Sequence, residues 1–215
     1  MTEIRPLFCD AVDATTALVR EPTLLERFDG PSTLAEFSLR GLAGHLLRAV
    51  TSAEGYLDGP EPDPGPEPLS AADYYAAVAA AASTDIDDDV NRAIRQRGVE
   101  AAPGSPEEFP PAWAGAAARI RARLAAESAG RLVRVYGGLV LTLDEYLVTR
   151  LIELVVHADD LAVSLGVAPP PLPPAATGLA IATLVEVARR RQGDTAVLRA
   201  LTRRERDAAA ALRVL

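Results

Sequence analysis

Apolar residues recur at helical spacing along most of the chain, and the segments between them are rich in proline and glycine. A first helical segment is predicted from Glu3 to Phe28, with a break or restart at Pro22. A second helix is predicted from Leu39 to Leu57, where it meets the stop signal Asp58-Gly59-Pro60. The stretch EPDPGPEP that follows is too rich in proline to continue a helix, so an extended surface loop is expected there.

Helical signals continue through the middle of the chain. Ser70 opens a third predicted helix, with Asp73 three residues later in a position close to a capping box. The alanine-rich body of this helix continues toward Arg97, and we expect it to end at Gly98. After a second proline-rich loop, Pro111 is a suitable first residue for a fourth helix that reaches about Ser128.

The pattern changes after the fourth helix. In RLVRVYGGLVLTL, β-branched residues flank Gly137-Gly138, which predicts a short β-hairpin. A long and strongly apolar helix is then predicted from Thr142 to Leu165, with Gly166 as its cap. The connector VAPPPLPPAA leads to two shorter helices, one from Ala175 to Arg191 and one from Asp194 onward. Since the chain has no internal repeat and no clean interior break, we expect a single domain built mainly of helices.

Composition and charge narrow the classes of function. With 49% hydrophobic and 24% charged residues, the 215-residue chain has the composition of a globular domain with a sizeable core. A net charge of −8 and the lack of a basic stripe make nucleic acid an unsuitable partner. The sequence contains no apolar run long enough for a membrane span and no signal-peptide pattern at its start, so we expect a cytoplasmic protein without a membrane partner.

The inventory of side chains removes several kinds of chemistry. All 22 basic residues are arginine, which excludes a Schiff-base lysine and the lysine of a P-loop. The single cysteine, Cys9, excludes an internal disulfide and is expected to be a small buried apolar residue. The aromatic side chains of Trp113, Tyr74, Tyr75 and Tyr136 are expected to fill the core or cap the interhelical surface, with the lining of a pocket as the alternative.

The two histidines of the chain give the main functional signal. His157 follows Glu153 by four residues, so both side chains lie on one face of the long predicted helix. His45, in the GLAGHLLRAV segment of an earlier helix, supplies a third donor. Two imidazoles and one carboxylate are the donor set of catalytic zinc sites and of non-heme iron sites. The pattern therefore indicates a metal held by His45, Glu153 and His157.

Interpretations without a metal stay open. A single histidine on an apolar helix face is usually a core residue that makes one hydrogen bond. Glu153 needs a cation in so apolar a helix. Besides a metal, Arg150, one turn earlier, could meet that need as a structural salt bridge, and so could a distant arginine. Arg150 could instead bind a carboxylate of a substrate or cosubstrate. Asp160 either accepts a hydrogen bond from the His157 ring and so orients a metal ligand, or belongs with Asp159 to a solvated acidic edge.

Taken together, these residues resemble a known family. The segment GLAGHLLRAV, followed late in the chain by TRLIELVVHADDLAVSLG, is similar to the N-terminal metal-binding domain of mycothiol-dependent maleylpyruvate isomerases, within the DinB-like superfamily. The family pattern is a histidine in the second helix and Glu-x-x-x-His-x-x-Asp-Leu-Ala in a later one. It falls on His45, Glu153, His157 and Asp160 here, and VRVYGGLVLTLDEYL resembles the short β insertion of the family. The resemblance covers residues 1 to about 165.

The resemblance implies an all-α fold, a DinB-like four-helix bundle in up-down-down-up order with a short β-hairpin insertion and extra C-terminal helices. Residues 1–168 would form the bundle, and residues 169–215 would be a C-terminal helical extension packed on the same domain. The resemblance also implies a divalent metal, Zn²⁺ in the mycothiol-using branch, bound by the three donors named above.

For function, the resemblance implies a low-molecular-weight thiol such as mycothiol as nucleophile or cosubstrate, acting on an electrophilic small molecule. The expected reaction is S-transfer or isomerisation, with Arg150 as a catalytic residue that binds substrate. Since only about fifty residues follow the bundle where the full isomerase has a further domain, maleylpyruvate isomerisation itself is not expected. The alternatives are a metal-dependent hydrolase or lyase that uses metal-bound water, and a non-enzymatic, homodimeric helical binding module.

Overall fold

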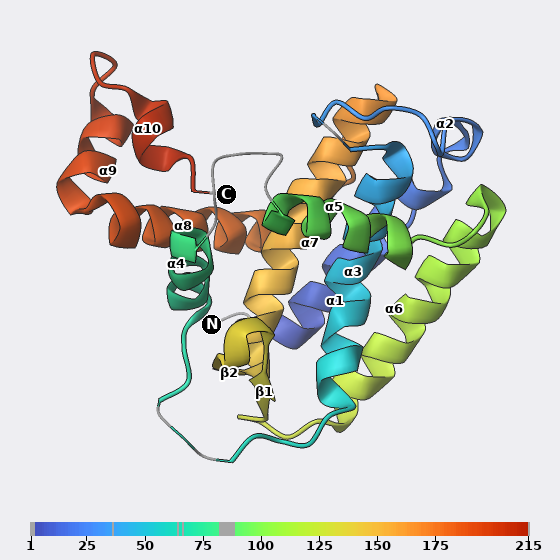
Figure 1. The fold of residues 1–215 in the computed structure, drawn as a ribbon, viewed down its shortest axis with the longest axis horizontal. Coiled ribbons are helices and arrows are strands. Elements are labelled where there is room, and N and C mark those ends of the chain that lie inside the picture. Colours follow the sequence, from blue (N-terminus) through green and yellow to red (C-terminus); the bar gives the residue numbers. More distant parts are fainter. Residues whose placement is uncertain (1–2, 36, 64, 66, 82–88, 215) are drawn as a thin grey trace.

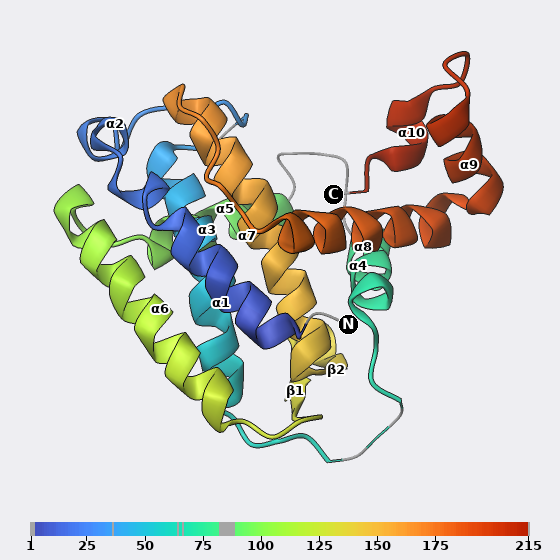
Figure 2. The same cartoon turned by 180° about the vertical axis from the view of Figure 1, so that it is seen from behind.

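The computed structural model describes residues 3–35, 37–63, 65, 67–81 and 89–214. Within them, four helices form a bundle (Figure 1): α1 (Ile4–Thr15), α3 (Leu39–Leu57), α6 (Phe109–Ala126) and α7 (Leu143–Leu165). Each of the four packs against two others, so they follow one another around the bundle in the order α1, α7, α3, α6. From behind, α1 and α6 lie in front of α3 (Figure 2).

Contacts between side chains fix the direction of each helix. Arg5 at the start of α1 forms an ion pair with Asp144 at the start of α7, so these two helices run in parallel. The same arginine donates a hydrogen bond to the carbonyl of Leu124 near the end of α6, which makes α6 antiparallel to α1. Glu54 and Arg119, both in the second half of their helices, pair across α3 and α6. The up-down-down-up order expected from the resemblance is therefore confirmed.

The apolar positions whose spacing predicted the helices form the core between them. One cluster of buried residues extends over all four bundle helices and both strands. Burying a large aliphatic or aromatic side chain stabilises a fold by about 1.5–3 kcal/mol. The largest side chains with almost no exposed surface include Phe8, Leu42, Leu46, Phe109, Trp113, Ile120, Tyr146 and Leu147. Cys9 is also buried, as expected.

Local capping explains why α3 and α7 begin where the sequence predicts. The Ser38 side chain accepts a hydrogen bond from the backbone N–H of Gly41 and caps α3. Thr142 caps α7 in the same way, and Gly166 ends it in the left-handed conformation with a φ of 71°. The predicted bounds of both helices are confirmed, because these signals act within a few residues.

The first segment and the fourth helix differ from their predicted bounds by small amounts. After α1 the chain forms a 3-10 helix, η1 (Leu18–Arg20), and then α2 (Pro22–Glu26), so the helix restarts at Pro22 as predicted. A further 3-10 helix, η2 (Pro106–Glu108), precedes α6. The fourth helix thus begins two residues before Pro111 and ends at Ala126, before the predicted end.

The predicted end of the third helix, at Gly98, is wrong. Ser70 caps α4 (Ala71–Ala81) as expected, through a hydrogen bond from the backbone N–H of Asp73. Residues 82–88, in the middle of the predicted helix, lie outside the described residues. Gly98, predicted as the stop, lies inside α5 (Asp89–Ala101). There it packs against Gly44 of α3 so closely that a Cβ on Gly44 would lie 1.8 Å from the Gly98 carbonyl oxygen. Gly98 is required for close helix packing and not for helix termination.

The short hairpin is confirmed. Strands β1 (Leu132–Arg134) and β2 (Val140–Thr142) pair antiparallel, with Val133 opposite Leu141. The turn between them contains η3 (Tyr136–Gly138), in which both glycines have a φ near 75° that L-residues rarely adopt. Tyr136, expected in the core, on the interhelical surface or in a pocket, is 68% exposed in this turn. That expectation was wrong because the ring stands at the tip of the hairpin.

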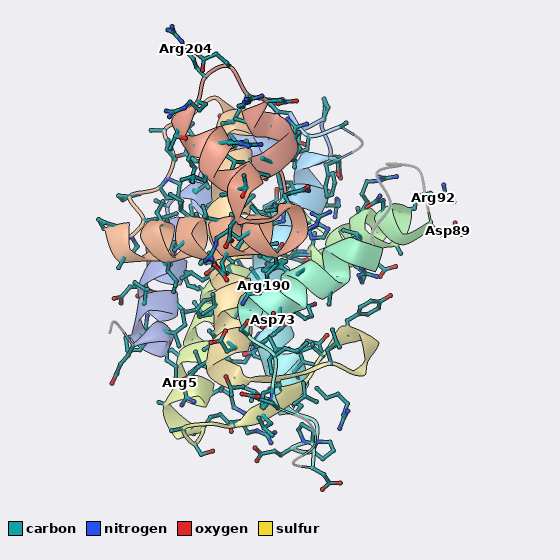
Figure 3. The ribbon with its side chains drawn as sticks, turned by 90° about the vertical axis from the view of Figure 1, so that its left-hand side faces the viewer. Arg5, Asp73, Asp89, Arg92, Arg190 and Arg204 are labelled. Carbon is teal, nitrogen blue, oxygen red and sulfur yellow. The ribbon has the colours of Figure 1, made fainter. Side chains whose placement is uncertain are left out.

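Three helices follow the bundle. They are α8 (Pro174–Gln192), α9 (Asp194–Thr202) and α10 (Ala208–Leu212), where the sequence predicted two, because Asp207 caps a separate last helix. Helix α8 crosses α4, α7 and α1, and its far end carries α9 and α10 away from the bundle (Figure 1). Arg190 of α8 forms an ion pair with Asp73 of α4 at 2.9 Å (Figure 3). In the part of the chain that the structure describes, no helix meets the length and apolarity that a membrane crossing requires.

Candidate metal centre

The seam between α3 and α7 brings the two histidines of the chain together. Because these helices are antiparallel, Ser52 of α3 lies beside Tyr146 of α7, with 3.0 Å between the two hydroxyl oxygens. About two turns further along the seam, His45 of α3 lies beside His157 of α7. The centroids of the two imidazole rings are 5.5 Å apart, and the ring planes are inclined by 50°.

His157 lies between two carboxylates of its own helix. Oε2 of Glu153 is 3.2 Å from Nε2 of His157, and Oδ2 of Asp160 is 3.2 Å from Nδ1. Spacings of four and three residues place all three side chains on one helix face. Each is mostly buried, which weakens the screening of their interactions by water. With both ring nitrogens facing carboxylates, the imidazole is held as a cation.

Tyr75 of α4 holds the other oxygen of Glu153. Its hydroxyl lies 2.8 Å from Oε1 of Glu153 and 3.0 Å from the backbone carbonyl of Thr149. Tyr75 is buried, so this contact fixes the carboxylate from the side of α4. Sequence reasoning considered Tyr75 only as a core or pocket residue. No signal in the sequence connects it with Glu153, because the contact depends on how α4 packs against α7.

These contacts shift the pKa values of the site in opposite directions. Burial alone raises the pKa of Glu153, but the hydrogen bond with His157 and the charge of Arg150 outweigh it and bring this pKa to about 2. Burial alone lowers the pKa of His157, but the hydrogen bonds with Asp160 and Glu153 outweigh it and raise this pKa to about 9. At neutral pH, Glu153 is therefore an anion and His157 a cation.

His45 is in a different state from His157. Its Nε2 lies 2.9 Å from the backbone carbonyl oxygen of Ile94 in α5, so this nitrogen carries a proton and donates a hydrogen bond. Burial, and after it the charge of His157, lowers the pKa of His45 to about 4. Helix α5 comes this close because Gly98 has no side chain; a Cβ there would lie 2.4 Å from Cδ2 of His45. His45 is thus neutral at pH 7.

Two of the distances in the cluster match those between ligands of a zinc site. Two donors on one tetrahedral Zn²⁺, each bonded at about 2.0–2.2 Å, lie about 3.3–3.5 Å apart, and two imidazole rings have centroids about 5 Å apart. The Glu153–His157 contact of 3.2 Å and the 5.5 Å between the two histidine rings agree with these values. The orientation of His45 differs from that of a ligand, because its Nε2 faces the carbonyl oxygen of Ile94. Among the described residues, no three His, Cys, Asp or Glu side chains are arranged as a metal site as they stand.

Arg150 does not take the role of structural partner to Glu153. Its Nε donates a hydrogen bond to the hydroxyl of Thr149 at 3.1 Å, and its guanidinium lies 5.0 Å from the centre of the Tyr146 ring. The ion-pair partner that the structure gives Glu153 is His157. Arg150 still acts on Glu153 through its charge. The salt-bridge interpretation of Arg150 is therefore wrong.

The fold and this cluster together define a class. A four-helix bundle in up-down-down-up order, with a histidine on its second helix and Glu-x-x-x-His on its fourth, is a DinB-like protein. The family model of the mycothiol maleylpyruvate isomerase N-terminal domain matches residues 8–162, and the chain belongs to this family. A search of curated proteins and a search of solved structures each returned no significant match.

Proposed function

We propose that the protein is a metal-dependent enzyme that uses a low-molecular-weight thiol of the mycothiol type. It would either join this thiol through its sulfur to an electrophilic small molecule (S-transfer) or isomerise that molecule. Two findings support this proposal. The chain belongs to a family named for mycothiol-dependent isomerisation, and its only two histidines meet beside Glu153 on the α3–α7 seam. The single observation that carries it is this meeting of two imidazoles and a carboxylate.

In this proposal His45, Glu153 and His157 hold a divalent ion, for which the nitrogen and oxygen donor set suits Zn²⁺. A bound zinc ion supplies a Lewis acid that lowers the pKa of a coordinated thiol or water. Asp160 holds Nδ1–H of His157 and so leaves Nε2 for the ion. Binding requires His157 to lose one proton, and it requires His45 to turn its ring away from the carbonyl of Ile94.

Other residues of the chain position the site. Tyr75 keeps one oxygen of Glu153 in a hydrogen bond, so the carboxylate is fixed before an ion arrives. Arg150, held over the Tyr146 ring, places a positive charge near Glu153, where it attracts an anionic group of the substrate. The burial of these groups limits the access of water, which strengthens each electrostatic interaction.

Elemental analysis of the purified full-length protein, after incubation with Zn²⁺ and removal of excess ion, tests the metal. We expect about one zinc per chain in the wild type. In the Glu153→Ala and His157→Ala variants we expect affinity to fall by a factor on the order of a thousand, since each removes one of three ligands. Asp159→Asn, next to the site but exposed, is the control and should bind normally. A wild type that binds no zinc when supplied with it would refute the proposal.

Turnover of monobromobimane, an electrophile, with mycothiol distinguishes the reaction classes. We expect turnover that requires both the metal and the thiol, and that the Glu153→Ala variant loses. Turnover of ester substrates without any thiol would assign the site to a hydrolase instead. Bound metal whose removal unfolds the protein, without turnover in either assay, would assign it a structural role and refute the enzyme proposal.

A further inference from the structure

Among the residues that the structure describes, three half-buried arginines without a carboxylate partner lie beside the candidate metal centre. They are Arg48 of α3, Arg97 of α5 and Arg150 of α7, which we call the arginine triad. The described ion pairs instead involve the arginines at positions 5, 40, 92, 119, 121, 123, 131, 189, 190 and 204. An exposed arginine needs no partner because water solvates it, but a half-buried guanidinium loses that solvation.

Helix register places Arg48 and Arg150 at one level of the α3–α7 seam. Arg48 follows His45 by three residues, and Arg150 precedes Glu153 by three. Both therefore lie between the level of the histidine pair and the level where Ser52 meets Tyr146. Two guanidinium groups thus lie one turn away from the candidate ligands, on the helices that carry them.

Arg97 joins them because α5 crosses α3 in backbone contact. The crossing point is the Gly44–Gly98 contact, where neither helix has a side chain to hold the other away. Arg97 directly precedes Gly98, and Arg48 lies one helical turn beyond Gly44. The proximity has an electrostatic consequence. Burial lowers the pKa of Arg48, and the charges of Arg97 and Arg150 lower it further.

The carboxylates closest to the triad in the candidate metal centre, Glu153 and Asp160, already have other hydrogen-bond or ion-pair partners. Both oxygens of Glu153 are held, one by His157 and one by Tyr75, and Asp160 is held by His157. Three like charges in one partly buried place oppose folding. Glu153 acts on Arg150 through its charge, but no carboxylate among the described residues lies within ion-pair distance of any of the three. In a protein of net charge −8, this local concentration of positive charge is a site for an anion.

We propose that the arginine triad binds a small organic dianion, through carboxylate or phosphate oxygens, and places it next to the metal centre. Guanidinium groups present paired N–H donors that match the oxygens of both anions. The inference rests on the proposed function, since it names the class of substrate or cosubstrate for the same site. It limits the electrophile or the thiol-bearing partner to a molecule with at least one anionic group.

Isothermal titration of the full-length, metal-free protein with succinate, and separately with inorganic phosphate, tests the triad. Succinamide, the neutral analogue of succinate, is the ligand control. We expect one anion per chain, with Arg48→Met and Arg97→Met each weakening its binding ten- to a hundredfold. Arg119→Met is the matched control, because it removes one charge from an exposed side chain paired with Glu54 and should bind as the wild type does. Stronger binding of succinate than of phosphate assigns the site to carboxylates, and the reverse order assigns it to phosphates.

Zinc content, measured on the same variants, separates the two proposals. We expect the triad variants to bind zinc normally and the Glu153→Ala variant to bind the anion while losing zinc. Circular dichroism and thermal unfolding check that each variant is folded. If Arg48→Met does not fold, the Arg97→Met result decides. Equal anion binding by wild type, triad variants and Arg119→Met, or no binding by the wild type, would overturn the inference and leave the metal proposal standing.

Discussion

The arginines beside the start of α7 and those beside its middle are held in opposite ways. Near the start of α7, Arg5 contacts Asp144 and three backbone carbonyl oxygens. Arg131, only 10% exposed in its side chain, contacts Glu61 and Glu127 and the carbonyl of Gly59. Further along α7, the arginine triad lies half-buried without any carboxylate in ion-pair distance among the described residues.

The difference separates arginines that hold the fold from arginines left for a ligand. A buried arginine whose N–H donors all have partners in the protein cannot bind a further anion. Replacing it leaves the carboxylate that it contacted without its partner. A half-buried charge without a partner opposes folding but keeps its donors for an anion. Sites of this kind exchange stability for binding, as functional sites commonly do.

The largest effect is expected where the triad is assembled. Gly44→Ala would place a Cβ 1.8 Å from the Gly98 carbonyl oxygen and push α5 away from α3. We expect the free energy of unfolding to fall by about 3 kcal/mol, measured by urea denaturation. Gly55→Ala on the same helix is the control, because its Cβ meets nothing within 4 Å. It should be neutral or stabilise by up to about 1 kcal/mol. A tolerated Gly44→Ala would contradict the close crossing of α3 and α5.

A second test compares two neighbouring acids. Asp160 contacts the Nδ1 of His157, whereas Asp159 is exposed. If His157 is a ligand, Asp160→Asn should weaken zinc binding 10- to 100-fold, because the His157 ring loses the anionic acceptor that makes it a stronger ligand. Asp159→Asn should leave zinc binding unchanged in the same competition titration with a chelator. Equal zinc affinities of the two variants would show that Asp160 does not support zinc binding.

A third test compares the stability effects of replacing a paired arginine and an arginine of the triad. Arg131→Met removes a nearly buried guanidinium that contacts Glu127 and the carbonyl of Gly59, and should lower the free energy of unfolding by about 2 kcal/mol. Arg48→Met removes a repelling charge without breaking a described contact, so stability should stay equal or rise. Thermal and urea unfolding of both variants measure the contrast. A marked loss of stability in Arg48→Met would place this residue among the structural arginines.

The smallest effect concerns the pH dependence of the metal-free protein. The folded pKa of His157 is about 9, above its ordinary value of 6.5, so its contribution to stability is complete below pH 6.5. That contribution is lost as pH rises from 6.5 to 9. We expect a decrease on the order of 1 kcal/mol over this range, since the side chains are partly open to water. His157→Gln should remove the decrease, and a wild-type profile that is flat from pH 6.5 to 9 would contradict the charged state of His157.

At acid pH, the stability depends on pH in the opposite direction, because Glu153 then takes up a proton. The pKa of Glu153 is about 2 in the folded protein, below its ordinary value of 4.5. Its contribution to stability is therefore present above pH 4.5 and lost as pH falls toward 2. The shifts of Glu153 and His157 arise from the same ion pair, so their contributions to the free energy of unfolding are not added.

Much of the secondary structure could be predicted from the sequence because its causes are local. The bounds of α3 and α7 follow from a capping serine or threonine, an apolar stripe and a stop signal, all within a few residues. The hairpin follows from two adjacent glycines that tolerate positive φ. The helical pair of Glu153 and His157 follows from a spacing of four.

Tertiary packing decided the rest, because these contacts join residues far apart in the chain. The sequence pattern predicts that Gly98 ends a helix. In the fold, Gly98 instead allows α5 to pack closely against α3, which brings the Ile94 carbonyl within hydrogen-bond distance of His45. Tyr75 reaches Glu153 only because α4 packs on α7. The sequence by itself determined which side chains carry chemistry and which helices hold them. Only the tertiary structure decided which arginines have partners, since pairing depends on distances that local spacing does not set.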